Sequence, residues 1–179
     1  YGRQMLCAAC AQLIVKDQLI RLKEYINSQG LQLIGDMPLY LSYQSSEVWA
    51  NQHLFELDAA GNRLRVAGVP PDAFSETGQL WGNPLYRWDV MREDGFQLFT
   101  HRIRDALAHL DKLRLDHFIG YVNYWAVAPK SVGADGQPEL PETALEGSWE
   151  KALPEDFFPL LQSLFPMDRF IAEDLGILN

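Results

Sequence analysis

Apolar residues recur along the chain with helical spacing in some segments and as short continuous runs in others. Residues 3–28 repeat apolar side chains at helical intervals, among them Leu13 and Ile14, which predicts a long amphipathic helix. Residues 31–41 are mostly apolar and predict a buried strand. The same order of helix and strand recurs twice: helices are predicted over 95–110 and 155–165, and strands over 112–118 and 169–175. This order predicts an α/β fold with a parallel sheet.

The segments between these elements are less regular. A short helix is predicted to begin at Ser45, and residues 59–62 separate two runs that resemble a hairpin. Residues 68–88 are rich in turn-forming residues yet carry several aromatic rings, so they predict a long irregular excursion. Residues 133–147 are polar and rich in proline and glycine, which predicts an exposed loop.

Chain length limits how much of a larger architecture is present. A closed (β/α)8 TIM barrel needs roughly 250 residues, and this chain has 179. Its pattern supplies about three βα units with an aromatic-rich loop insertion. We therefore expect residues 1–179 to be a single segment of a (β/α)8 catalytic domain, a partial barrel cut from a longer chain at both ends.

Composition narrows the classes of partner. The net charge of −9 argues against binding to nucleic acid or to an anionic membrane, whereas neutral ligands such as sugars are unaffected. The apolar run at residues 5–15 is too short to cross a bilayer. Cys7 and Cys10 fall in the first predicted helix, where we expect buried small residues rather than metal ligands. Such sparse cysteine usage suits a reducing compartment.

Two predicted strands each deliver a carboxylate near their C-terminal end. Alternation along residues 112–118 places Arg114 and Asp116 on one face, with the neighbouring leucines on the other. Asp116 is then either a nucleophile held ionised by Arg114 or half of a structural ion pair. Glu173 ends the last strand, either as a general acid or as an acid at a helix N-terminus. Paired carboxylates at strand ends suit glycoside chemistry.

The aromatic residues of the 68–88 excursion allow two interpretations. Phe74, Trp81, Tyr86 and Trp88 alternate with polar residues, so the rings either stack on sugars or fold back into the core. The histidines contain no His-x-x-x-His pair, and neither a Walker loop nor a Gly-x-Gly-x-x-Gly motif occurs. A metal site or nucleotide chemistry therefore has no support.

Five motifs in order make the chain resemble the 4-α-glucanotransferases, also called amylomaltases or disproportionating enzymes. They read IGDMPLY at 34–40, VAGVPPD at 66–72, FSETGQLWGNPLY at 74–86, RLDHF at 114–118 and IAEDLG at 171–176. The resemblance implies a (β/α)8 barrel and a retaining transfer of α-1,4-glucan segments between maltooligosaccharides through a covalent glycosyl-enzyme intermediate. It implies a cytoplasmic enzyme and no metal or organic cofactor.

The resemblance also implies roles for individual residues. By motif position, Asp116 is the nucleophile and Glu173 the acid/base. The residues implied to bind substrate are Asp36, Tyr40, Asp72, Gln79, Trp81, Asn83, Arg114 and His117. Ile119 stands where many relatives carry arginine. The third carboxylate of the family belongs to a His-Asp motif that does not occur before Asn179, so we expect this segment alone to lack part of the catalytic set.

Three rival readings follow from the same residues. An α-glucan hydrolase would use the same two acids with water as acceptor. A non-catalytic glucan-binding segment would account for the missing third acid. A metal-dependent phosphohydrolase using Asp36, Asp116 and Glu173 is a further class, although phosphate-binding basic residues are few.

Overall fold

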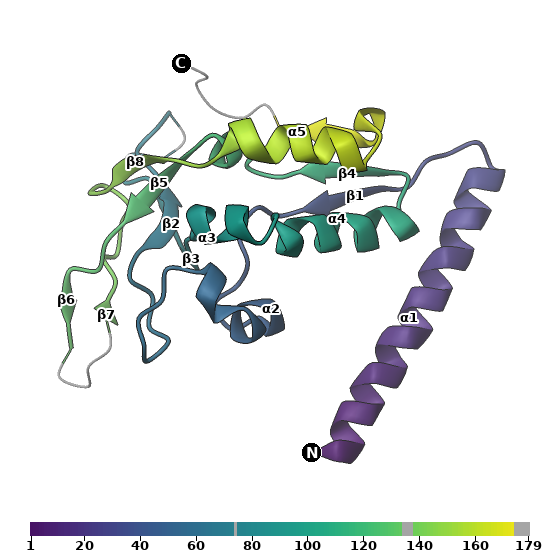
Figure 1. The fold of residues 1–179 in the computed structure, drawn as a ribbon, viewed down its shortest axis with the longest axis horizontal. Helices are drawn as coiled ribbons and strands as arrows, with labels where there is room; N and C mark the ends of the chain where they lie inside the picture. Colours follow the sequence, from purple (N-terminus) through teal and green to yellow (C-terminus); the bar gives the residue numbers. More distant parts are fainter. Residues whose placement is uncertain (74, 134–137, 174–179) are drawn as a thin grey trace.

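The structure is a computed structural model that describes residues 1–73, 75–133 and 138–173. Within these residues, two larger sheets, a two-stranded β6-β7 sheet and five α-helices make up the fold (Figure 1). The helices are α1 (Gly2–Ser28), α2 (Ser46–Ala50), α3 (Trp88–Glu93), α4 (Gln97–His109) and α5 (Pro154–Leu164), with 3-10 turns η1 (Gln52–Leu54), η2 (Phe118–Tyr121) and η3 (Met167–Arg169). The strands are β1 (Ile34–Met37), β2 (Val66–Val69), β3 (Gln79–Pro84), β4 (Lys112–Leu115), β5 (Asn123–Val127), β6 (Ser131–Val132), β7 (Pro138–Glu139), β8 (Ser148–Lys151) and β9 (Phe170–Ala172).

The predicted parallel sheet is present and has the order β1-β4-β9. Strand β4 lies in the centre, with Asp36 opposite Arg114 and Arg114 opposite Ile171. Its two faces differ as the alternation predicts, since Leu113 and Leu115 are buried while Arg114 is only partly covered. Each of the three strands is shorter than predicted, and residues 174 and 175 of the last prediction lie outside the described residues.

The buried face of this sheet packs against helices α4 and α5, which run alongside β1 and β4 in Figure 1. Phe99 and Ile103 of α4 and Phe157 of α5 are almost fully buried. The rings of Phe99 and Phe157 meet edge to face with centroids 5.3 Å apart, which joins the two helices. The described residues leave the opposite face largely uncovered, because Ile34 and Ile171 on it remain 53% and 37% exposed.

A second sheet was not predicted. It is antiparallel with the order β3-β2-β5-β8, and it uses the 66–84 and 123–151 segments. Strand β3 falls inside the stretch predicted to be irregular, which was wrong for residues 79–84. Strand β3 pairs with the preceding strand β2, and this tertiary pairing overrides the weak strand propensity of Gly82 and Pro84.

Two other segments between the main elements also differ from their predictions. Leu57 and Arg63 form a single bridge instead of the full hairpin expected around residues 59–62. The loop predicted over 133–147 includes β7 and the fully buried Ala144, whose carbonyl accepts a hydrogen bond of 2.9 Å from Trp125 Nε1. Residues 134–137 of that prediction lie outside the described residues.

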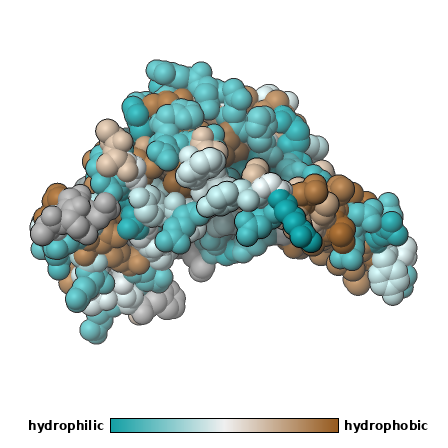
Figure 2. Space-filling model, turned by 90° about the horizontal axis from the view of Figure 1, so that it is seen from below, coloured by the Kyte–Doolittle hydropathy of each residue, from teal (hydrophilic) through white to brown (hydrophobic). Residues whose placement is uncertain are grey.

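Helix α1 forms as predicted, but its surroundings differ from the prediction. It extends away from the two sheets in Figure 1, and none of its residues is buried. Cys7 and Cys10 are exposed, so their predicted burial was wrong. The helical period was correct, but α1 meets the body mainly through polar contacts such as Lys16 Nζ to Asp105 Oδ1, 2.8 Å apart. Its apolar residues, including Leu13 at 69% exposure, leave brown surface along this arm in Figure 2.

Candidate active site

Three carboxylates converge on one guanidinium at the uncovered face of the parallel sheet. Arg114 Nη1 lies 2.7 and 2.8 Å from the two oxygens of Asp36 and 3.0 Å from Asp116 Oδ1. Arg114 Nη2 donates to Glu173 Oε1. The hydrogen bond to Asp36 and the negative charges of Glu173, Asp36 and Asp116 raise the pKa of Arg114 above its ordinary value. The site is therefore built around a permanent cation.

Backbone geometry fixes where the two strand-end acids stand. The Asp116 N–H donates to the carbonyl of Met37, 3.0 Å away, which ties the end of β4 to β1. The Glu173 N–H donates to the carbonyl of Leu115 at 3.2 Å, which ties the end of β9 to β4. Two ladder hydrogen bonds thus hold Asp116 and Glu173 at the same edge of neighbouring parallel strands. This is the edge where barrel enzymes carry their catalytic groups.

The two acids differ in exposure. The Glu173 side chain is 11% exposed, against 38% for Asp116 and 61% for Asp36. Glu173 is also the more constrained, because its Oε2 accepts a hydrogen bond of 2.6 Å from the backbone N–H of His117 while its Oε1 faces Arg114. The arrangement therefore provides one enclosed carboxyl group beside one open carboxylate.

His117 links this cluster to the aromatic residues. Its backbone is left-handed, with φ of 48°, and this turn directs its N–H toward Glu173. Its ring lies edge-on to Trp81 with centroids 4.7 Å apart and near Tyr40 at 6.0 Å. Burial lowers the pKa of the His117 ring, opposed by the charge of Asp116, so the imidazole is neutral at pH 7.

The aromatic residues of the 68–88 excursion divide between the core and the site, as both interpretations allowed. Tyr86 and Trp88 are buried at 1% and 6% exposure and pack against Phe99. Trp81 stays 38% exposed beside His117 and Tyr40. Phe74 lies outside the described residues.

Tyr40 lies at the boundary between core and site. Its ring stacks on Tyr86 and also approaches Trp81, each with centroids 6.0 Å apart. Burial, aided by neighbouring tyrosines, raises the pKa of its hydroxyl well above the ordinary value. Tyr40 therefore stays a neutral phenol beneath the exposed indole of Trp81.

The remaining predicted residues lie in strand β3 or in the turn before it. Gln79 Oε1 accepts a hydrogen bond of 3.2 Å from Trp81 Nε1, which orients the indole. Asn83 Nδ2 donates to the carbonyl of Leu41 at 2.8 Å. Asp72 lies on the turn before β3, where Oδ1 accepts a 2.8 Å hydrogen bond from Ser75 N–H. Contacts therefore join Gln79 to the site through Trp81, whereas Asn83 and Asp72 organise neighbouring backbone.

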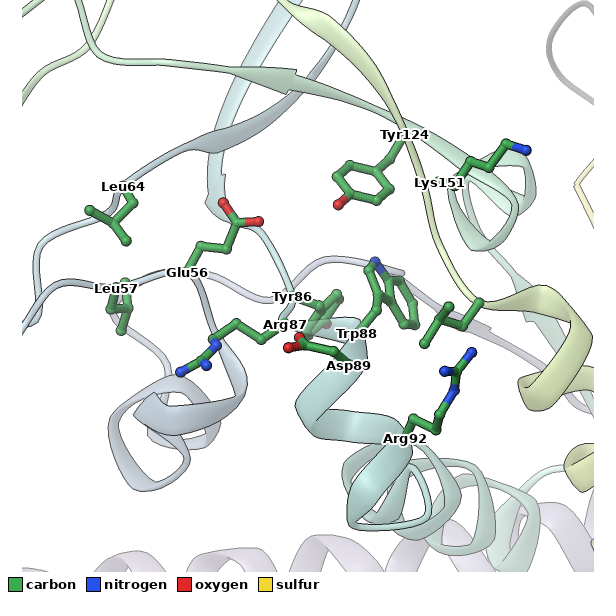
Figure 3. Close-up of a pocket in the computed structure, with 11 residues that line it drawn as sticks. Glu56, Leu57, Leu64, Tyr86, Arg87, Trp88, Asp89, Arg92, Tyr124 and Lys151 are labelled. Atoms are coloured by element: carbon green, nitrogen blue, oxygen red, sulfur yellow. The ribbon is translucent and has the colours of Figure 1, made fainter.

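The cavities do not coincide with the carboxylates. A cavity of about 440 Å³ is lined by Trp88, Tyr86, Tyr124 and charged residues including Glu56 and Asp89 (Figure 3). None of the predicted site residues lines it. The carboxylate cluster therefore lies outside this cavity.

Gly120 belongs to the site but was not predicted from the sequence. Gly120 is buried, and a Cβ there would come within 2.6 Å of the His117 ring and 2.4 Å of the Leu39 side chain. Its absence of a side chain makes room for the imidazole. A glycine three residues after His117 is visible in the sequence. Its contact with Leu39 could not be predicted, because Leu39 is distant in the sequence.

Arg114 fills the position that a cation would need between the three carboxylates. Within the described residues no group of histidine, cysteine, aspartate and glutamate side chains has the arrangement of a metal site. The phosphohydrolase reading requires Asp36, Asp116 and Glu173 to hold a metal ion, whereas here all three face a guanidinium.

Comparison with known proteins decides the family. A family model described as 4-alpha-glucanotransferase matches residues 1–179. The chain belongs to the 4-alpha-glucanotransferase family. It is 44% identical over 168 residues to the 4-alpha-glucanotransferase of Aquifex aeolicus, covering 94% of this chain and 33% of that protein. It is 44% identical over 158 residues to the Thermus thermophilus 4-alpha-glucanotransferase, covering 88% of this chain and 30% of that protein.

Solved structures of the family share the fold. The amylomaltase from Streptococcus agalactiae in complex with acarbose superposes with a TM-score of 0.79 at 43% identity, over 91% of this chain and 31% of that one. The amylomaltase from Corynebacterium glutamicum shares the fold alone, with a TM-score of 0.69 at 18% identity, over 91% of this chain and 21% of that one. The chain thus spans about a third of the length of the 4-alpha-glucanotransferases of Aquifex aeolicus and Thermus thermophilus.

Proposed function

We propose that this chain carries two acids of a retaining 4-α-glucanotransferase, which moves α-1,4-glucan segments between maltooligosaccharides through a covalent glycosyl-enzyme intermediate. The observation that carries the proposal is the meeting of Asp116 and Glu173 at neighbouring nitrogens of Arg114. A retaining mechanism requires two carboxyl groups about 5–5.5 Å apart on opposite sides of the reacting bond. Two acids that share one guanidinium suit that close spacing better than the wider spacing of an inverting site.

Asp116 is the nucleophile in this proposal, and Glu173 is the acid/base. The more open Asp116 carboxylate attacks the anomeric carbon, while Glu173 protonates the departing glycosidic oxygen. Glu173 then takes the proton from the hydroxyl of the acceptor sugar, which attacks the glycosyl-Asp116 ester and regenerates the free enzyme. The His117 N–H and the Arg114 guanidinium hold the Glu173 carboxyl in place for both steps.

The other predicted residues form the sugar-binding surroundings. Asp36, Arg114 and His117 stand beside the two acids, and Tyr40 and Trp81 provide aromatic surface near them. Asp72, Gln79 and Asn83 belong to the approach that covers the donor and acceptor sugars. Flat rings suit the apolar faces of sugars, while the amide and carboxylate groups suit their hydroxyls.

We further propose that residues 1–179 are one segment of a (β/α)8 catalytic domain, with β1, β4 and β9 as three of its parallel strands. The support is the sheet face that bears Ile34, Arg114 and Ile171, which the described residues leave largely uncovered. In a closed barrel this face is filled by side chains from further strands.

None of the described helices has the length and the apolar composition that a membrane span requires. The cytoplasmic location remains a prediction, since a potato relative is named as chloroplastic or amyloplastic.

The test is the product profile of the intact protein incubated with maltotriose. Transfer yields free glucose together with maltooligosaccharides longer than maltotriose, resolved by chromatography. If the protein is an α-glucan hydrolase, only products shorter than maltotriose appear. If it is a non-catalytic glucan-binding segment, no products appear. Either of those profiles would refute the proposed transfer.

A further inference from the structure

The backbone carbonyl of Met37 fixes the end of β4 that carries the proposed nucleophile. It accepts the Asp116 N–H at 3.0 Å, so the position of Asp116 depends on where this carbonyl points. The next carbonyl along the chain, that of Pro38, accepts a hydrogen bond of 2.8 Å from Arg102 Nη2. Arg102 belongs to α4, which runs alongside β1 in Figure 1. Two successive carbonyls therefore join α4 to the nucleophile.

Pro38 makes the contact with Arg102 more important for this part of the backbone. Because proline has no backbone N–H, only the carbonyl of Pro38 can take part in a hydrogen bond. On its C-terminal side, the Leu39 carbonyl accepts a hydrogen bond of 2.6 Å from the Tyr86 hydroxyl. Loss of the Arg102 side chain would leave Leu39 held but would release the carbonyl next to the one that binds the nucleophile.

Aromatic side chains surround the Arg102 guanidinium. Its central carbon lies 5.8 Å from the centroid of the Phe99 ring, and its Nη1 atom is buried. Burial raises the pKa of the Tyr86 and Tyr121 hydroxyls, and the charge of Arg102 opposes this rise, so the cation acts on both phenols. A planar guanidinium suits such a site among rings better than an ammonium group does. The surrounding rings therefore hold the donor that binds the Pro38 carbonyl.

We propose that Arg102 is a positioning residue for the nucleophilic step, which acts on Asp116 through the backbone that follows β1. Attack on the anomeric carbon requires an aligned carboxylate, and a displacement of about 1 Å can cost about 100-fold in rate. The exposed indole of Trp81 comes from β3, which this hydrogen bond does not hold. Loss of Arg102 should therefore slow the chemical step and leave the binding of glucan intact.

This inference rests on the proposed function, and the experiment separates the two. The intact protein with Glu173→Gln is mixed with α-maltotriosyl fluoride. Because fluoride leaves without an acid, the rate at which the protein gains a maltotriosyl group measures attack by Asp116 alone. Adding Arg102→Met should lower this rate constant about tenfold, within the range that a misplaced group can cost. The affinity for maltoheptaose, measured by calorimetry on the same Glu173→Gln proteins, should not change. Arg102→Lys keeps a cationic donor and should react faster than Arg102→Met.

Arg104→Met is the matched control and should leave the rate constant unchanged. Arg104 lies on the same helix, and its guanidinium carbon is 5.9 Å from the centroid of the Phe165 ring. Partial unfolding would lower the fraction of protein that reacts but not the rate constant. If Arg102→Met does not fold, Arg102→Gln, with its shorter side chain, takes its place. An unchanged rate constant, an equal loss of rate and affinity, or no recovery with Arg102→Lys would overturn the positioning role. Absence of mass gain in the Glu173→Gln protein itself would instead refute the proposed function.

Discussion

Gly120 is the position where one added methyl group should disturb the site most directly. A Cβ at Gly120 would lie 2.4 Å from Leu39 Cδ2 and 2.6 Å from His117 Cδ2, whereas ordinary contacts begin near 3.4 Å. Each neighbour must therefore move by roughly 1 Å. Leu39 is 1% exposed in the core, and the His117 ring is confined by Trp81, so neither has free space. Overpacking of this kind costs about 1–3 kcal/mol.

The assay for Gly120→Ala is urea unfolding of the intact protein, paired with the rate of transfer from maltotriose. We expect the free energy of unfolding to fall by about 1–3 kcal/mol. We also expect kcat to fall, because displacement of His117 disturbs its N–H contact with Glu173. Gly2→Ala is the control, since a Cβ there meets nothing within 4 Å. If Gly120→Ala matched the unmodified protein in both measurements, the argument that Gly120 makes room for His117 would be wrong.

Three further changes test other contacts. Tyr86→Phe removes a buried 2.6 Å hydrogen bond to the Leu39 carbonyl and should cost about 1–3 kcal/mol in thermal or urea unfolding; an unchanged stability would contradict this. The pKa of His117 is lowered by burial, so the unfolded chain binds more protons below about pH 6.5 and stability should fall as the pH drops through that range. His117→Asn should therefore shrink the difference in unfolding free energy between pH 7 and pH 5, and an equal difference would refute a buried neutral ring. Trp81→Ala should weaken binding of maltoheptaose in calorimetry, whereas unchanged affinity would remove Trp81 from the sugar path.

The strand-end chemistry was predictable because alternation is a local property. Leu113 and Leu115 mark the buried face of β4, so Arg114 and Asp116 had to share the other face. What the alternation does not predict is that Arg114 contacts Asp36 and Glu173 as well. Those partners are 78 and 59 residues away in the sequence, and only the parallel register brings them together.

The antiparallel sheet and the surroundings of α1 could not be predicted from sequence patterns, because both depend on tertiary contacts. Strand β3 contains Gly82 and Pro84, which are typical turn residues, and only its pairing with β2 makes this segment a strand. The helical period of α1 predicts which residues share a face, but not whether that face has a partner.

The most direct test of the central claim compares Asp116→Asn and Glu173→Gln in the intact protein with two donors, maltotriose and α-maltotriosyl fluoride. Fluoride leaves without protonation, so a protein that lacks only its general acid should still form the glycosyl-enzyme. Glu173→Gln should therefore be inactive with maltotriose yet gain the mass of a maltotriosyl group with the fluoride, whereas Asp116→Asn should react with neither donor. Transfer from maltotriose by Asp116→Asn would contradict the assignment of Asp116 as the nucleophile.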